Sequence, residues 1–232
     1  MGYKYEMHLH TCEVSCCASA TAEEQVEFYH KLGYAGICVT NHFINGTTHV
    51  PKNIPWADQV AGYYHAYELA AEAAKGTGMD VFFAWEYSIG GGADFLVYGL
   101  GTDWLLENED AMKLSPKAYM QKVREDGAIV VHAHPFREAG YIDMIRLMPR
   151  DVDGVEIYNA NRTDFENTMA KQYAQNYGLW ASAGSDNHSA GRIRRLAGIE
   201  ASRRYTDLKE LLLDTASHPE WLFCQTIPEM DV

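Results

Sequence analysis

The sequence predicts an α/β protein in which parallel strands close, or nearly close, into a barrel. Two observations predict this fold class. Short apolar runs alternate with longer segments of helical period, and about seven such runs fall within the 232 residues. A doubly wound open sheet is the alternative, because periodicity alone does not distinguish it from a barrel. No repeat, low-complexity tract or linker marks a boundary, so we expect one domain over residues 1–232.

Each expected strand is a short run of apolar residues between polar or glycine-containing segments. The seven runs are 3–10, 36–40, 81–85, 95–98, 128–132, 154–157 and 180–183. The first expected helix begins after Thr21, because Thr21 and Glu24 have the spacing of a capping box, and it ends near Gly33. Similar signals, including Ser115 before a proline, predict four more helices. They are 56–75, 116–125, 164–177 and 207–216.

The composition is that of a globular protein with an acidic surface. Hydrophobic residues make up 47% of the chain and charged residues 22%, and the formal net charge is −13. A surface this acidic repels a long phosphate backbone, so we expect no binding of long nucleic acid through a basic face. A small phosphorylated substrate or a short oligonucleotide is compatible with this acidic surface, because buried cations reverse the electrostatic potential inside a cleft. The sequence predicts no particular oligomeric state.

Features of targeting and redox chemistry favour a cytoplasmic protein. No apolar run reaches the length of a membrane span, and the first six residues lack the apolar core of a signal peptide, so we expect no membrane association. The cysteines are odd in number and scattered, which indicates free thiols in a reducing compartment. They are Cys12, Cys16, Cys17, Cys38 and Cys224.

Histidines and carboxylates follow the apolar runs at the points where the strands end. The carboxyl ends of parallel strands meet at one edge of a sheet, and residues two apart on a strand share a face. A single histidine at a strand end is more often a hydrogen-bonded structural residue than a ligand. Several imidazoles together with carboxylates instead indicate a multinuclear metal centre, because divalent cations satisfy the whole set. The set comprises His8, His10, His42, Glu86, His132, His134, Asp186 and His188.

The order of these motifs resembles that of the polymerase and histidinol phosphatase (PHP) family of metal-dependent phosphoesterases. The matching motifs are His8-x-His10-Thr11, Thr40-Asn41-His42, an isolated Glu86, His134-Pro135 and Ser185-Asp186-x-His188. They cover residues 8–188, which is nearly the whole chain. The resemblance implies a distorted seven-stranded (β/α) barrel, similar to a TIM barrel, with two or three divalent metal ions (Zn, Mn or Fe) in the mouth at its strand ends.

The resemblance also implies a ligand set. The first metal takes His8, His10, Glu86 and Asp186. Glu86 bridges to a second metal, which also takes His134. A third metal takes His42 and His188, with one more ligand from the loop after the first motif.

Three positions depart from the family pattern. Asn41 stands where the family often has Asp, and an amide carries no charge. Cys16 lies in the loop where an Asp or His ligand is common, and a thiolate there favours zinc; a small buried thiol is the alternative interpretation. Asp94 is the only donor in the stretch that usually carries another histidine, so it either replaces that ligand or caps the turn into the strand.

Other polar residues near these strand ends have supporting roles in the interpretation. Glu156 and Asn159 either hold ligands and line the pocket or are ordinary strand-end residues. His132, next to the motif, is a residue that orients a ligand or a candidate acid. Arg162 and Arg192 are candidates for binding phosphate, since a guanidinium grips phosphate at two points; a solvated ion pair is the alternative.

The resulting prediction is hydrolysis of a small phosphate ester, either a phosphomonoester or a short nucleotide, by a hydroxide that bridges two metal ions. His188, His132 or water then protonates the leaving group. One alternative is an amide or cyclic-amide hydrolase on a similar barrel, although no lysine closes any expected strand. Another is an inactive metal-binding regulatory module. The segment 43–56 either covers the mouth as a lid or is a plain surface connection.

Overall fold

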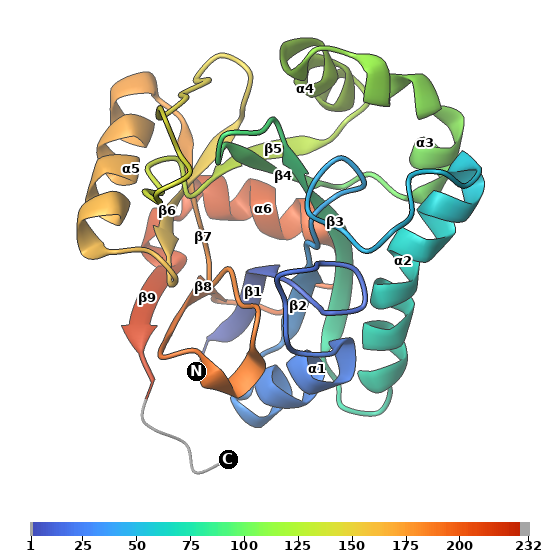
Figure 1. The fold of residues 1–232 in the computed structure, drawn as a ribbon. Coiled ribbons are helices and arrows are strands. Elements are labelled where there is room, and N and C mark those ends of the chain that lie inside the picture. The colour runs from blue at the N-terminus through green and yellow to red at the C-terminus, as the bar shows by residue number, and fades with distance from the viewer. Residues whose placement is uncertain (1, 228–232) are drawn as a thin grey trace.

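The computed structural model describes residues 2–227, and its strands form one nine-stranded sheet (Figure 1). The strand order is β7-β6-β5-β4-β3-β2-β1-β8-β9. The strands are β1 (Tyr3–Leu9), β2 (Gly36–Val39), β3 (Asp80–Ser88), β4 (Asp94–Tyr98), β5 (Ile129–Ala133), β6 (Gly154–Asn159), β7 (Trp180–Gly184), β8 (Arg195–Ala201) and β9 (Leu222–Thr226).

Strands β1 to β7 form a nearly closed, barrel-shaped sheet. A parallel bridge joins Leu9, at the end of β1, to Asn187, which follows β7. The start of β1 pairs with β8 instead, and β9 extends the sheet beyond β8. Both β8 and β9 run antiparallel to their partners. The expected α/β barrel is therefore confirmed in outline, but the prediction of seven strands was wrong.

Strand β4 also departs from the expected parallel arrangement, since it runs antiparallel to both β3 and β5. Its connection to β3 is a short turn in which Gly90, Gly91 and Gly92 all have positive φ. So short a turn joins antiparallel strands only, because a parallel crossover needs a dozen or more residues. The remaining neighbours within the barrel, β1–β2, β2–β3, β5–β6 and β6–β7, are parallel.

The helices surround the sheet, and their caps agree with the sequence signals. Thr21 with Glu24, and Thr163 with Glu166, form complete capping boxes, and Ser115 caps a third helix. Within residues 2–227, no helix combines the length and apolar character needed to cross a membrane. The helices are α1 (Ala22–Lys31), α2 (Trp56–Ala73), α3 (Thr102–Glu107), α4 (Pro116–Glu125), α5 (Asp164–Tyr177) and α6 (Leu208–Ser217), with short 3-10 helices at Glu109–Lys113, Ala190–Arg192 and Pro219–Trp221.

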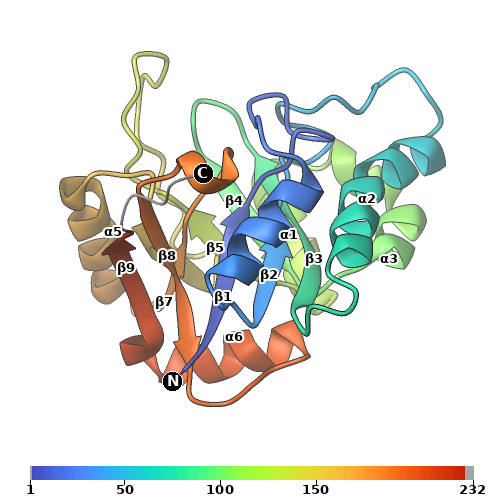
Figure 2. The same ribbon diagram turned by 90° about the horizontal axis from the view of Figure 1, so that it is seen from below.

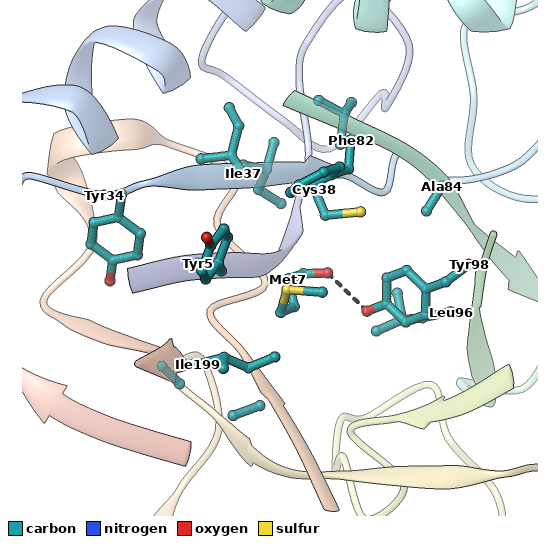
Figure 3. Close-up of a cluster of buried hydrophobic side chains, with 14 of the residues drawn as sticks. Tyr5, Met7, Tyr34, Ile37, Cys38, Phe82, Ala84, Leu96, Tyr98 and Ile199 are labelled. Atoms are coloured by element: carbon teal, nitrogen blue, oxygen red, sulfur yellow. Dashed lines mark hydrogen bonds between the residues drawn. The ribbon is translucent and has the colours of Figure 1, made fainter. Parts of the chain in front are cut away.

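Two apolar clusters hold the layers together and leave one end of the barrel to the site. The first includes Tyr5, Met7 and Tyr98, and the Tyr98 hydroxyl donates to the Met7 carbonyl at 2.9 Å (Figure 3). The second packs Trp85 and Phe43 against the helices. Figure 2 shows α6 across the end at which β1 begins, with long loops at the opposite end. The carboxyl end of β1 therefore opens beneath those loops.

Candidate metal centre

Five buried side chains from four strands meet at the loop end of the barrel. His8 lies in β1 and Glu86 in β3, while His10, His134 and Asp186 directly follow β1, β5 and β7. None of the five is more than 4% exposed. Their donor atoms form three-residue groups in which all atoms lie within 4.8 Å of one another. The groups are His8–His10–Glu86, His8–His134–Asp186, Glu86–Asp94–His134 and, on the cleft side, His10–His42–His188.

Glu86 lies at the centre of this cluster. Its Oε1 is 3.1 Å from Nε2 of His134 and 3.4 Å from Nε2 of His8, and its Oε2 is 3.5 Å from Nε2 of His10. Oδ1 of Asp186 is 3.3 Å from the same nitrogen of His10. One carboxylate thus faces three imidazoles, two from the end of β1 and one from the end of β5.

Two of the five residues reach the cluster through unusual backbone conformations. His134 has φ of +29° and Asp186 has φ of +53°, both in the region that non-glycine residues rarely adopt. His132, two residues before His134, stays in regular strand geometry. Its ring stacks on Phe95 at 4.5 Å and meets Tyr173 edge-on, so it points toward the helical layer. The structure therefore places His132 outside the cluster, because the chain turns between His132 and His134.

Glu156 holds two members of the cluster in place. Its Oε1 is 3.0 Å from Nδ1 of His8, which directs Nε2 of that ring into the cluster. Its Oε2 accepts the backbone N–H of His134 at 3.0 Å and the amide of Asn159 at 2.8 Å. A carboxylate on the far nitrogen of a ligating histidine is the usual support of a metal-bound imidazole.

Gly184 allows strand β7 to approach this support. A Cβ at this position would lie 2.4 Å from Cβ of His8 and 2.7 Å from Oε1 of Glu156. Both distances are far shorter than a van der Waals contact. A side chain larger than glycine would therefore separate β7 from β1 at the centre of the site.

Asn41 has a structural position behind His10. Its Oδ1 accepts the backbone N–H of Thr11 at 2.7 Å and the hydroxyl of Ser15 at 2.8 Å. The Ser15 hydroxyl is in turn 3.1 Å from Nδ1 of His10 and accepts the backbone N–H of His42. Asn41 thus fixes Ser15, and Ser15 orients His10, so the amide is already engaged where the PHP pattern often has Asp.

The protonation states of the inner cluster suit divalent cations. Although burial raises the pKa of Glu86, the imidazoles of His42 and His134 hold that pKa well below its usual range, and similar neighbours lower the pKa of Asp186. Burial and the nearby His188 lower the pKa of His10 well below its ordinary value. Ligands must be deprotonated to bind a metal ion, and the pKa shifts of Glu86, Asp186 and His10 favour that form.

Two further observations test whether a cation fits. Nε2 of His8 and Nε2 of His10 face each other at 3.1 Å, and the carboxylates Glu86 and Asp186 surround them. Burial lowers the pKa of His8, but Glu156 and Asp186 outweigh it and raise that pKa well above its ordinary value. Oε2 of Glu86 is buried and has no hydrogen-bond partner. Buried carboxylates with converging imidazoles are the donor set of divalent metal ions, so the residues fit such a group.

A second group of donors faces the solvent. Nδ1 of His42 is 2.6 Å from Oε2 of Glu86, and its Nε2 is 3.2 Å from Sγ of Cys17. The ring of His188 stacks on His10 at 4.1 Å, and its Nδ1 is 2.9 Å from the Asp186 carbonyl. Both Cys16 and Cys17 are exposed, but only Cys17 lines the cleft, where it faces His42. The thiol near the site thus belongs to the residue after the expected one.

Asp94 begins β4 at the edge of the inner cluster. It is 3% exposed and belongs to the donor group with Glu86 and His134, while its Oδ2 also pairs with Nη2 of Arg137 at 2.9 Å. Burial and the negative charge of Glu86 raise the pKa of Asp94. Arg137 thus occupies one oxygen of Asp94 and leaves the other for the inner donors. The sequence interpretation missed Arg137, although it lies two residues after Pro135.

A cleft of about 640 Å³ covers the cluster. The side of its wall next to the cluster includes Cys17, His42, Asp94, Asp186 and His188. Two arginines, Arg137 and Arg162, complete the wall, and the Nε atom of each is buried without a hydrogen-bond partner. From the segment 43–56, Thr47 contributes to the lining.

The second arginine singled out in the sequence, Arg192, lies away from the cleft. Arg192 lines a separate surface pocket with Ser19 and Phe28, because it falls in the 3-10 helix that turns away after Asp186. Arg195, nearby in the chain, forms a surface ion pair with Asp164 at 2.8 Å. Of the two candidates for phosphate binding, Arg162 reaches the cleft and Arg192 does not.

Comparison with known proteins identifies the fold. No protein-family model and no curated protein matches the sequence. Among solved structures, a two-domain protein from Bacteroides vulgatus that contains a predicted PHP-like metal-dependent phosphoesterase superposes with a TM-score of 0.71 at 14% identity. This chain therefore shares its fold with a protein described as PHP-like. The match covers 97% of this chain and 65% of that protein, so this chain spans less than two thirds of its length. The structural comparison agrees with the resemblance drawn from the sequence motifs.

Other proteins with this PHP-like fold carry different names. Endonuclease Q, solved with a 27-mer duplex that has an abasic lesion at the active site, matches 94% of this chain and 57% of its own at 11% identity, with a TM-score of 0.59. An amidohydrolase from Chromobacterium violaceum, solved with bound sulfate and no metal, matches 98% of both chains at 14% identity, with a TM-score of 0.55. The fold alone therefore does not select the bond that is cleaved.

Proposed function

We propose that the protein is a metal-dependent hydrolase of small phosphate esters. The observation that carries the proposal is the convergence of His8, Glu86, His134 and Asp186 beneath a cleft that also contains two arginines. The buried cluster provides imidazole and carboxylate donors for divalent ions. The arginines provide the groups that bind phosphate oxygens. A phosphate ester is the substrate class that uses both the buried metal donors and the two arginines.

The donor groups divide into three positions. In the proposal, His8, His10, Glu86 and Asp186 hold one ion, and Glu86 with His134 holds a second, to which Asp94 adds the oxygen that does not pair with Arg137. The cleft-side donors, His42 and His188, hold a third. Nitrogen and oxygen donors of this kind suit Zn²⁺, Mn²⁺ or Fe²⁺.

When bound, divalent ions lower the pKa of water so that hydroxide attacks phosphorus near neutral pH, and they stabilise the charge that develops on phosphate. The chain's own residues supply orientation. Glu156 keeps Nε2 of His8 directed inward, and Ser15 does the same for His10. Arg162 and Arg137 would hold the non-reacting phosphate oxygens, since both have unpartnered Nε atoms at the cleft wall.

His188 delivers a proton to the leaving group only when the third metal position is empty, because one ring nitrogen cannot hold an ion and a proton at once. This side chain lines the cleft, and the Asp186 carbonyl 2.9 Å from its Nδ1 accepts that N–H, so Nε2 is the nitrogen that carries either the ion or the proton. His132 does not fit this role, because it packs on Phe95 away from the cleft. Water is the other possible donor of the proton.

The proposal is tested with protein that is stripped of metal and reloaded with Mn²⁺ or Zn²⁺. We expect hydrolysis within a panel of phosphomonoesters and short oligonucleotides, and its loss in Glu86→Gln, which keeps the shape but removes the central charge. Glu68→Gln is the matched control, because Glu68 is exposed in α2. Reloaded protein that leaves the whole panel intact would contradict the proposal.

The main rival is an amide or cyclic-amide hydrolase, which the similarity in fold to an amidohydrolase keeps in view. The cleft favours phosphate, because the described part of its lining contains two arginines, which bind phosphate oxygens. It contains no lysine of the kind that would favour the amide hydrolase. Turnover of cyclic amides by the reloaded protein, without turnover of phosphate esters, would establish the rival. Metal binding with no turnover of either class would instead favour an inactive regulatory module.

A further inference from the structure

We propose that Cys17 supplies a thiolate ligand to the ion held by His42 and His188 and so makes this position selective for zinc. The inference rests on the metal centre proposed above. It concerns the loop between β1 and α1, in which the sequence pattern pointed to Cys16. Two features of the structure support it: the spacing of the donors and a carboxylate on the far side of the His42 ring.

The spacing of the donors is close to that of a zinc site. Sγ of Cys17 lies 3.2 Å from Nε2 of His42, and the thiol is also within hydrogen-bonding reach of the His188 ring. A tetrahedral ion with Zn–S of about 2.3 Å and Zn–N of about 2.05 Å would place sulfur and nitrogen about 3.6 Å apart. The donors need to separate by only a few tenths of an ångström to admit the ion.

The second feature is Glu86, which approaches the same group from the interior. Its Oε2 is 2.6 Å from Nδ1 of His42, the ring nitrogen opposite the one that faces Cys17. A carboxylate beside the far nitrogen of a histidine is the usual support of a metal-bound imidazole. Glu86 therefore leaves Nε2 of His42 directed toward Cys17.

The position of Cys17 also differs from that of a cysteine kept for packing. Cys38, in β2, is completely buried among apolar side chains, as is typical of a structural thiol. Cys17 instead lies on the cleft wall between two histidines. A soft thiolate with two imidazoles binds Zn²⁺ in preference to Mn²⁺, whereas the inner carboxylate-rich donors accept either ion. The cleft-side position is then the zinc-selective one.

Cobalt substitution tests the ligand directly. The full chain is loaded with Co²⁺ under anaerobic, reducing conditions, and we expect a near-ultraviolet thiolate-to-Co²⁺ charge-transfer absorption. Cys17→Ser should lose this absorption and weaken Zn²⁺ binding at the cleft-side position by at least about tenfold. Cys16→Ser is the matched control and should keep both. Cys17→Asp should keep a bound ion without the absorption and shift the preference toward Mn²⁺.

The outcomes separate this inference from the proposed reaction. An absorption that survives in Cys17→Ser, or that disappears in Cys16→Ser, overturns the assignment even if phosphate esters are hydrolysed. The same holds for wild-type protein that binds Co²⁺ with no charge-transfer band. Conversely, a band that depends on Cys17 in a protein that hydrolyses no phosphate ester supports the thiolate ligand and refutes the reaction. Failure to bind Co²⁺ at all overturns both. Circular dichroism confirms that each variant is folded.

Discussion

Replacing Gly184 with alanine should lower both the stability of the protein and its affinity for metal ions. The added Cβ would lie 2.4 Å from Cβ of His8, against an ordinary carbon–carbon contact of about 3.5–4.0 Å, so β7 must move by about 1 Å or more. Overpacking of this kind costs about 1–3 kcal/mol in the free energy of unfolding. The movement also displaces Glu156 from His8, and loss of such support typically weakens metal binding by about 10–100-fold.

The assay combines urea unfolding of metal-free protein with chelator competition for Zn²⁺. Gly62→Ala is the matched control, because Gly62 lies within α2 and no atom lies within 4 Å of its added Cβ. That variant should gain up to about 1 kcal/mol, since alanine is a better helix former than glycine. The reasoning is refuted if the free energy of unfolding of Gly184→Ala lies within about 0.5 kcal/mol of the wild-type value and its Zn²⁺ affinity is unchanged. Strand β7 would then not pack against His8 as closely as the distances imply.

Three further variants and one treatment extend the test. Glu156→Gln should weaken Zn²⁺ binding by about 10–100-fold with little change in fold, measured by chelator competition; unchanged affinity would show that Glu156 does not support His8. His132→Phe should keep activity and equal or exceed the wild type in urea, because it removes two buried unpartnered ring nitrogens and keeps the stacking; lost activity would return His132 to the site. Arg162→Lys should raise KM for phosphate esters more than it lowers kcat, since lysine cannot bind phosphate at two points; an unchanged KM would exclude this role. Removing metal with a chelator should lower stability by about 2.7 kcal/mol relative to protein at 100 times the Kd, and thermal unfolding that does not change would argue against a metal centre.

Sequence reasoning predicted where the strands and the site residues lie along the chain better than it predicted which way the side chains point. The expected strands coincide closely with β1 to β7, and the histidines and carboxylates do follow them, because strand ends are visible as the last residues of apolar runs. β8 and β9 were not predicted. Arg195–Ala201 is interrupted by a glycine and a glutamate, and Leu222–Thr226 is a short run of mixed character. Their pairing depends on contacts distant in sequence.

The misplaced side chains have local causes that sequence patterns do not contain. The period-2 pattern puts His132 and His134 on one face, but the positive φ of His134 separates them. Cys16 and Cys17 are adjacent cysteines that no sequence pattern distinguishes. Only the conformation of the loop, in which Ser15 forms an antiparallel bridge with Thr48, shows that Cys17 is the one facing His42. Arg137 follows a recognised motif, yet its ion pair with Asp94 could only be seen once β4 lay beside β5.

The bridge between Leu9 and Asn187 and the contact of His8 with Glu156 have a consequence for folding kinetics. These pairs join residues separated by more than a hundred positions, and the His8–Glu156 pair spans 148. Contacts of such high sequence separation form late and slow the search for the native state. A nascent chain therefore has no complete centre until β7 has been synthesised and docked. Once an ion is bound across that seam, the two halves cannot part without releasing it, so loading should lengthen the lifetime of the native state.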